Sequence, residues 1–118
     1  MSEHQHESIF IIDATDEFKK WLKGLKDPIG RAAVARRIER ASVGNFGDHK
    51  SVGNGIYEMR IQIGAGYRVY YAQRGEIIYI LLNGGDKSTQ QHDIAQAKAL
   101  WENLKQRDKQ NLGGAYNE

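Results

Sequence analysis

The chain has 118 residues, of which 40% are hydrophobic and 27% charged, and its formal net charge is +2. This length and composition predict one compact domain with a modest core, which excludes schemes that need two domains and a cleft between them. The absence of cysteine excludes disulfides, cysteine-ligated metal centres and thiol catalysis. No apolar run approaches the roughly 20 residues that span a bilayer. We therefore expect a cytoplasmic protein without a membrane partner.

The small net charge hides an uneven distribution along the chain. Residues 19–74 contain 12 Lys or Arg against 4 Asp or Glu, an excess of eight positive charges. A segment this basic favours a polyanionic partner such as nucleic acid. A solvated basic face that serves only solubility would have the same composition, so both interpretations stay open.

The two ends of the chain differ from its middle. Residues 1–8 and 107–118 are polar and lack periodic apolar positions, which predicts two flexible tails. Residues 9–106 contain no internal repeat and no low-complexity linker, so they are predicted to form a single domain.

The first half of this domain is predicted to contain one strand and two helices. Residues 9–12 form a short apolar run that is typical of a strand, and Asp13 or Thr15 can cap the helix that follows. Residues 18–25 then carry apolar side chains at helical spacing. A second helix begins at Asp27 and Pro28 and ends before Gly44. Its predicted exposed face carries Arg31, Arg36, Arg37 and Arg40.

The second half is predicted to contain a loop, three strands and a helix. Four glycines in residues 44–55 indicate a loop that exposes His49 and Lys50. A final helix begins near Ser88, which with Gln91 matches a capping box. The whole chain is therefore predicted to be an α+β domain with a small, mostly antiparallel sheet. The three predicted strands, joined as a meander, are residues 56–63, 67–73 and 76–83.

Alternation along the first two of these strands collects polar side chains on one sheet face. If residues 64–66 form the turn, Arg60 faces Tyr70 across the hairpin. Gln62 faces Arg68 in the same way. The polar set on this face is Glu58, Arg60, Gln62, Arg68 and Tyr70.

This face has the groups that cleavage of RNA requires. Lys87 and the start of the last helix return to the Arg68 end of the face. Attack by the 2′-hydroxyl needs a base, positive charge for the phosphorane and an acid for the leaving 5′ oxygen, while Tyr70 could stack on a base or orient a phosphate. A structural interpretation stays open, in which Glu58 and Arg60 form an ion pair and Tyr70 is packed.

The histidines carry weaker signals. His4 and His6 have no third ligand in register, so we predict no metal site, and no nucleotide-binding glycine motif or other cofactor motif is present. His49, beside Lys50, could contact phosphate or act as an acid. His92, in the first turn of the last helix, has the same two possible roles.

Three stretches of the chain carry a resemblance to a known family: FKKWLKGLKDPIGRAAVARRIERASVGNFGD, GIYEMRIQIGAGYRVYYAQ and IIYILLNGGDKSTQQHDIAQAKAL. Over about residues 9–104 they resemble the RelE/HigB-like toxins of type II toxin–antitoxin modules, in particular the phage-derived addiction-module killer branch. The most specific parts are the pair Glu58 and Arg60, residues 66–71, and residues 84–88 followed by Asp93.

The resemblance implies an α+β fold of the microbial RNase type. It also implies an mRNA interferase, a metal-independent endoribonuclease that cleaves mRNA in the ribosomal A site and stops translation. The implied partners are mRNA, the 70S ribosome and a cognate antitoxin, which in this branch is a helix-turn-helix protein of the HigA type.

The resemblance also implies roles for individual residues. By position, Arg68 matches the family's arginine that stabilises the phosphate. Arg60 matches a basic residue on the preceding strand, and Lys87 one that follows the last strand. The expected RNA-binding set is Tyr70, Gln62, His49, Lys50, His92, Arg36, Arg37 and Arg40.

The chain departs from this pattern at two places. Relatives of the RelE type have a lysine where this chain has Glu58, and a tyrosine near the start of the last helix, where this chain offers only residues 91–93. The general base and acid therefore stay open, and Glu58 as base with Lys87 or His92 as acid is one hypothesis.

Two other functions fit the same resemblance. The first is a ParE-like toxin that binds DNA gyrase and needs no acid–base set. The second is an inactive relative that is retained for binding its antitoxin or RNA.

Overall fold

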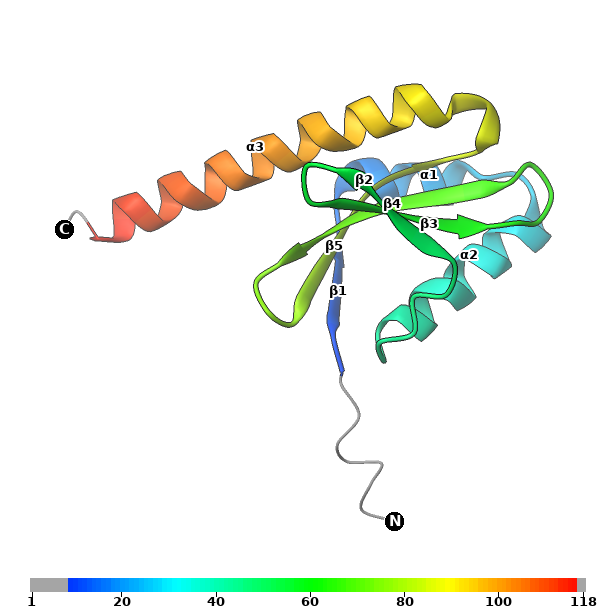
Figure 1. The fold of residues 1–118 in the computed structure, drawn as a ribbon, viewed down its shortest axis with the longest axis horizontal. Helices are drawn as coiled ribbons and strands as arrows, with labels where there is room; N and C mark the ends of the chain where they lie inside the picture. The colour runs from blue at the N-terminus through cyan, green and yellow to red at the C-terminus, as the bar shows by residue number, and fades with distance from the viewer. Residues whose placement is uncertain (1–8, 117–118) are drawn as a thin grey trace, which may run out of the picture.

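The computed structural model describes residues 9–116, with side chains up to residue 111. These residues form one five-stranded mixed sheet of order β1-β5-β4-β3-β2 and three helices, which confirms the predicted α+β class (Figure 1). Between β5 and the last helix lies a short 3₁₀ turn, η2. The elements are β1 (Ile11–Ala14), α1 (Asp16–Gly24), α2 (Pro28–Ala41), β2 (His49–Gly53), β3 (Ile56–Ile61), β4 (Tyr67–Arg74), β5 (Ile78–Gly85), η2 (Lys87–Thr89) and α3 (Gln90–Tyr116).

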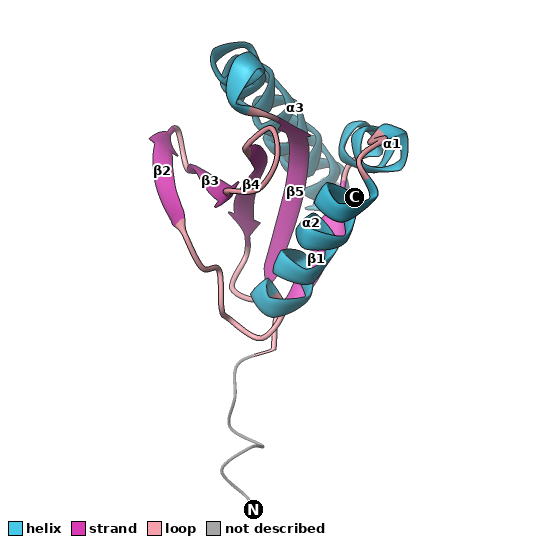
Figure 2. Ribbon diagram, turned by 90° about the vertical axis from the view of Figure 1, so that its right-hand side faces the viewer, coloured by secondary structure: helices cyan, strands magenta, loops and turns pink. Residues whose placement is uncertain are grey.

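Helices cover both faces of the sheet, and each face has its own core. On one face, α1 and α2 bury Phe18 and Val34 against Met59 and Val69. On the other, α3 buries Trp101 and other side chains against β4 and β5. Figure 2 shows β2 at one edge of this sheet, with β1 beyond β5 at the other.

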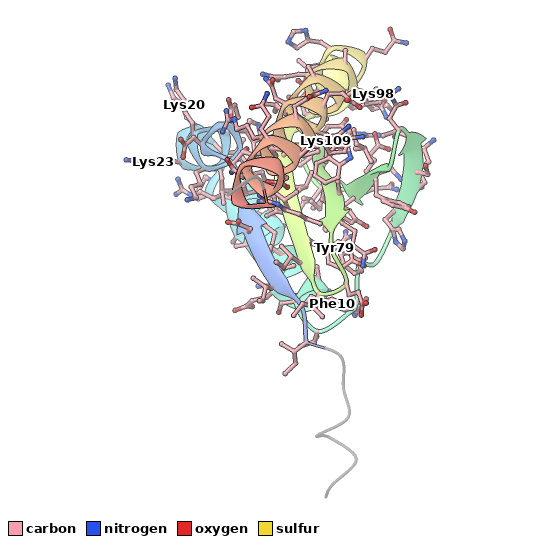
Figure 3. All side chains as sticks on the ribbon, turned by 90° about the vertical axis from the view of Figure 1, so that its left-hand side faces the viewer. Phe10, Lys20, Lys23, Tyr79, Lys98 and Lys109 are labelled. Atoms are coloured by element: carbon pink, nitrogen blue, oxygen red, sulfur yellow. The ribbon has the colours of Figure 1, made fainter. Side chains whose placement is uncertain are left out.

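The first two helices begin where the sequence predicts. The Thr15 hydroxyl accepts a hydrogen bond from the backbone N–H of Phe18 (3.0 Å) and caps α1. Asp27 accepts from the N–H of Gly30 (3.1 Å) and caps α2 ahead of its N-terminal proline. Lys20 and Lys23 project from α1 away from the sheet (Figure 3), so this helix has the basic outer surface that its pattern indicates.

The predicted loop of residues 44–55 is wrong in part, because it contains β2. This short strand pairs with β3 as the far edge of the sheet, with His49 opposite Met59 and Lys50 opposite Glu58. Its residues have little β-propensity, so tertiary pairing with β3 determines the strand.

The register of the β3–β4 hairpin differs from the prediction by two residues. Arg60 lies opposite Arg68, not Tyr70, because the turn spans residues 62–66. Gly64 and Gly66 have φ of 56° and 77°, and the N–H of Gly66 bonds the carbonyl of Ile63 (3.0 Å). A shift of two residues keeps every side chain on its predicted face.

The final helix also differs from the prediction. Asp86 caps the turn through the N–H of Ser88 (2.8 Å), with Thr89 as its reciprocal partner, so the predicted pairing of Ser88 with Gln91 is wrong. Helix α3 continues to Tyr116, through most of the predicted tail of residues 107–118. There Arg74 of β4 binds Asp108 (Nε to Oδ2, 2.9 Å), which holds this end of the helix to the sheet. Residues 1–8, 117 and 118 lie outside the described residues.

None of the helices described here is both long enough and apolar enough to cross a membrane.

Candidate functional site

A basic groove lies at the turn end of the β3–β4 hairpin. Arg60 and Arg68 enter it from opposite positions on the two strands. Lys87 reaches it from η2, where its N–H bonds the carbonyl of Ala65 (3.4 Å). Four of the six polar side chains predicted for this sheet face therefore converge on the groove, whereas Glu58 and Tyr70 do not line it. The groove is lined by Arg60, Gln62, Ile63, Gly64, Ala65, Gly66, Arg68 and Lys87.

Arg68 is the most constrained of the three cations in the groove. Its side chain is 13% exposed, and its Nε lies 3.7 Å from a carboxylate oxygen of Glu58. Its Nη1 donates to the carbonyl of Gly66 (2.7 Å). A Cβ at Gly66 would lie 3.2 Å from that same Nη1 and 3.4 Å from the Cβ of Lys87, so glycine permits this close approach.

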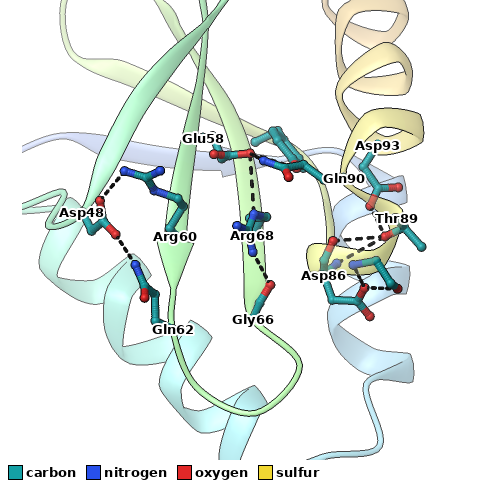
Figure 4. Close-up of polar contacts among 12 residues, drawn as sticks. Asp48, Glu58, Arg60, Gln62, Gly66, Arg68, Asp86, Thr89, Gln90 and Asp93 are labelled. Carbon is teal, nitrogen blue, oxygen red and sulfur yellow. Dashed lines mark hydrogen bonds and ion pairs between the residues drawn. The ribbon is translucent and has the colours of Figure 1, made fainter.

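Arg60 has a different carboxylate partner. Its Nη2 lies 2.8 Å from Asp48, and Gln62 donates to the other oxygen of the same carboxylate (2.9 Å; Figure 4). These hydrogen bonds, that from Arg60 first, lower the pKa of Asp48. The suggested ion pair between Glu58 and Arg60 is therefore wrong. Sequence reasoning missed Asp48, whose only signal was an acidic residue in a glycine-rich segment.

Glu58 and Tyr70 lie beneath α3 and are both fully buried. The carboxylate of Glu58 accepts hydrogen bonds from the amide of Gln90 (2.6 Å) and from the hydroxyl of Tyr70 (3.3 Å). Burial, together with the adjacent Glu58 carboxylate, raises the pKa of Tyr70, so its phenol stays neutral and donates. The prediction that Tyr70 stacks on a base or orients a phosphate is wrong, because α3 covers its ring and its hydroxyl is bonded to Glu58. Glu58 likewise has no surface through which to contact a substrate directly.

The arginines of α2 separate into two groups. Arg37 is half-buried and donates to three backbone carbonyls, those of Arg60 (2.6 Å), Phe46 (2.8 Å) and Asp48 (3.2 Å). The prediction that Arg37 contacts RNA is therefore wrong. Arg37 instead has a structural role, because it holds the segment before β2 against β3. Exposed Arg36 and Arg40 line a depression that adjoins the groove. The basic surface thus continues from the groove onto α2.

The remaining predicted contacts do not line the groove. His49 faces a separate aromatic depression beside Phe46 and Tyr57. Lys50 is exposed on the edge strand β2, and His92 is exposed on the first turn of α3. The structure therefore does not bring these three side chains together with Arg68.

A metal site is not evident in the part of the chain that the structure describes, where no three His, Cys, Asp or Glu side chains gather in a way that could hold an ion. The prediction of no site at His4 and His6 lies outside the described residues.

Comparisons with known proteins agree with this fold. Residues 20–102 match the family described as phage-derived protein Gp49-like (DUF891). An uncharacterised protein of Haemophilus influenzae is 50% identical over 93 residues, which are 79% of this chain and 94% of that protein.

Two solved structures share the fold at low sequence identity. A chain of the intact E. coli RelBE toxin–antitoxin complex has a TM-score of 0.52 and 15% identity, covering 65% of this chain and 95% of its own. The isolated E. coli RelE toxin has a TM-score of 0.51 and 13% identity, covering 74% of this chain and 97% of its own. The expected RelE-like fold is confirmed, and the chain belongs to the Gp49-like phage-derived family.

Proposed function

We propose that this protein is the toxin of a toxin–antitoxin module and acts as an mRNA endoribonuclease. The observation that carries this proposal is the convergence of Arg60, Arg68 and Lys87 on one groove. A cleaved phosphodiester passes through a crowded phosphorane with additional negative charge, and fixed cations stabilise that state best when they need not reorganise. Arg68, held by Gly66 and Glu58, is such a cation.

Proton transfer in this proposal falls to Lys87. Four side chains were candidates for proton transfer from the sequence, and of these Glu58 is buried and both His49 and His92 lie outside the groove, while Lys87 lines it. An ammonium group can protonate the leaving 5′ oxygen as the phosphorus–oxygen bond breaks. The residues that line the groove include no carboxylate or imidazole, so the proton of the attacking 2′-hydroxyl passes to water.

The proposed substrate is mRNA held on the ribosome. The groove is shallow and offers few contacts to one nucleotide, whereas the adjoining Arg36 and Arg40 extend the basic surface along α2. Phosphate contacts spread over such a surface supply affinity without sequence readout. We also propose a cognate antitoxin of the helix-turn-helix type as the partner that inhibits the protein.

The proposal is tested in a reconstituted bacterial translation reaction by mapping the ends of the mRNA. The wild-type protein is expected to produce new 5′ ends, and Arg68→Ala is expected to produce none. Arg107→Ala, which removes an exposed arginine on α3, is the matched control and should cleave like the wild type. Intact mRNA with normal protein synthesis contradicts the proposal. Toxicity in cells that survives Arg68→Ala favours a gyrase-binding toxin instead.

A further inference from the structure

A buried polar cluster lies directly behind the basic groove. It consists of Glu58 on β3, Arg68 on β4 and Gln90 at the start of α3 (Figure 4), together with Tyr70 on β4. One carboxylate oxygen of Glu58 is the common partner of the other three side chains. Arg68 alone extends from this cluster into the groove.

Stability does not explain why a charged pair is buried at this position. Burying a carboxylate and a guanidinium removes both from water, and their attraction compensates only when the remaining polar atoms are also bonded. Here the second oxygen of Glu58 and the Nε of Arg68 are buried without any hydrogen bond among the described residues. An apolar pair of similar volume would fit the core between the sheet and α3 at least as well.

The geometry of Arg68 indicates what the cluster does. A free arginine side chain has four rotatable bonds, and holding it in one rotamer costs up to about 2 kcal/mol. Two contacts fix this guanidinium: Nη1 on the carbonyl of Gly66, and Nε against Glu58. Its remaining nitrogen, Nη2, makes no hydrogen bond to residues 9–111 and is the one available to an anion in the groove.

We propose that Glu58 is a positioning residue, which holds Arg68 in the orientation that presents Nη2 to a phosphate, and that Tyr70 and Gln90 fix Glu58 for this task. The inference rests on the proposed function, because the phosphate is that of the bound RNA. It assigns no proton transfer to Glu58. The carboxylate acts through Arg68 and does not touch the substrate.

The test compares Glu58→Gln with Glu58→Ala and measures two properties. The first is the hydrogen-exchange rate of the Arg68 Nε–H in the free protein, read by ¹⁵N NMR. The second is the affinity for an RNA oligonucleotide made uncleavable by a 2′-deoxy residue. Glu58→Ala should accelerate exchange about tenfold or more and weaken RNA binding about tenfold. Glu58→Gln, which keeps the packing of the side chain but removes its charge, should restore only part of both.

Two further variants guard against an effect of misfolding. Tyr70→Phe and Gln90→Ala leave the charged pair intact and remove only its supports, and each should accelerate Arg68 exchange by less than Glu58→Ala does. Glu102→Gln is the control, because Glu102 is exposed and pairs with Lys105 on the surface of α3. It should leave both properties unchanged.

The outcomes separate this inference from the proposed function. Unchanged Arg68 exchange in a folded Glu58→Ala protein overturns the positioning role, whatever the RNA does. Accelerated Arg68 exchange in Glu58→Ala, found together with a wild-type protein that neither binds nor cleaves RNA, supports the positioning of Arg68 and contradicts the function proposed for the groove. Normal exchange in Glu58→Gln combined with complete loss of cleavage overturns the inference in favour of a general base.

Discussion

Arg60 and Arg68 lie directly opposite each other on β3 and β4, and each is paired with its own carboxylate. Like charges at opposed positions in a sheet destabilise it unless they are compensated. Asp48 compensates Arg60 at the surface, whereas Glu58 compensates Arg68 within the core. The pairing thus keeps two guanidinium groups beside one groove.

Asp48 partly neutralises the groove, so removing its charge should strengthen RNA binding. Asp48→Asn keeps one of the two acceptor oxygens that Arg60 and Gln62 use while adding one net positive charge. With about 0.7 of a counterion released per phosphate contact, one more effective contact corresponds to about a fourfold gain in affinity at physiological salt. Titration of a labelled RNA at several salt concentrations measures this gain. Asp16→Asn on α1 makes the same change in net charge away from the groove, and an equal gain there would contradict a local effect.

Gly66 is expected to be required for the site as well as for the turn. Gly66→Ala places a side chain at φ 77° and against Arg68 and Lys87, so both stability and cleavage should fall. Gly75→Ala is a matched control, because φ is 81° there and nothing lies within 4 Å of the added Cβ. Each substitution should lower the free energy of unfolding by about 1–2 kcal/mol, but only Gly66→Ala should reduce cleavage. Denaturant unfolding and end mapping distinguish these effects, and equal loss of cleavage in both variants would argue against the contact with Arg68.

Alternation along the strands was enough to predict which side chains share a face, but not how the hairpin pairs. The predicted face holds because a shift by two residues preserves the alternation of β3 and β4. The register was missed because it depends on the left-handed conformations of Gly64 and Gly66 in a longer turn, and the sequence does not distinguish this turn from a three-residue one.

The burial of Glu58 and Tyr70, two members of the predicted site, could not be predicted from the alternation of apolar and polar residues either. The apolar face of the last helix, which includes Trp101, indicates that this helix packs against the domain. It does not indicate which face of the sheet the helix covers. Because α3 covers the face that carries Glu58 and Tyr70, the accessible site is reduced to the turn end. Asp48 was missed for a related reason: its contacts with Arg60 and Gln62 require β2, a strand formed by tertiary pairing.

Arg36 and Arg37 on α2 provide a further test, because one substitution should lower RNA affinity and the other should lower stability. Arg37→Ala removes a charged donor to three carbonyls and should lower the free energy of unfolding by about 2–3 kcal/mol. Arg36→Ala removes an exposed side chain and should change stability by less than about 0.5 kcal/mol, while reducing RNA affinity and its salt dependence. Denaturant titration and RNA binding measure the two effects. A stable Arg37→Ala protein would contradict the assigned structural role.

Asp27 predicts how stability depends on pH. Hydrogen bonds from the N–H of Gly30 and from the Tyr67 hydroxyl (2.8 Å) lower the pKa of Asp27. Because the pKa is lower in the folded state than in the unfolded state, the stabilisation is complete above the unfolded value, about 3.9, and is lost as pH falls through the folded value. Thermal unfolding followed from neutral pH downward should therefore show a decline in Tm below about pH 4. Tyr67→Phe removes one of these hydrogen bonds and should make that decline shallower, with a lower Tm at neutral pH. If Tyr67→Phe shows the same decline of Tm at low pH as the wild type, other carboxylates cause that decline. Asp48 is the next candidate, because its pKa is also lowered.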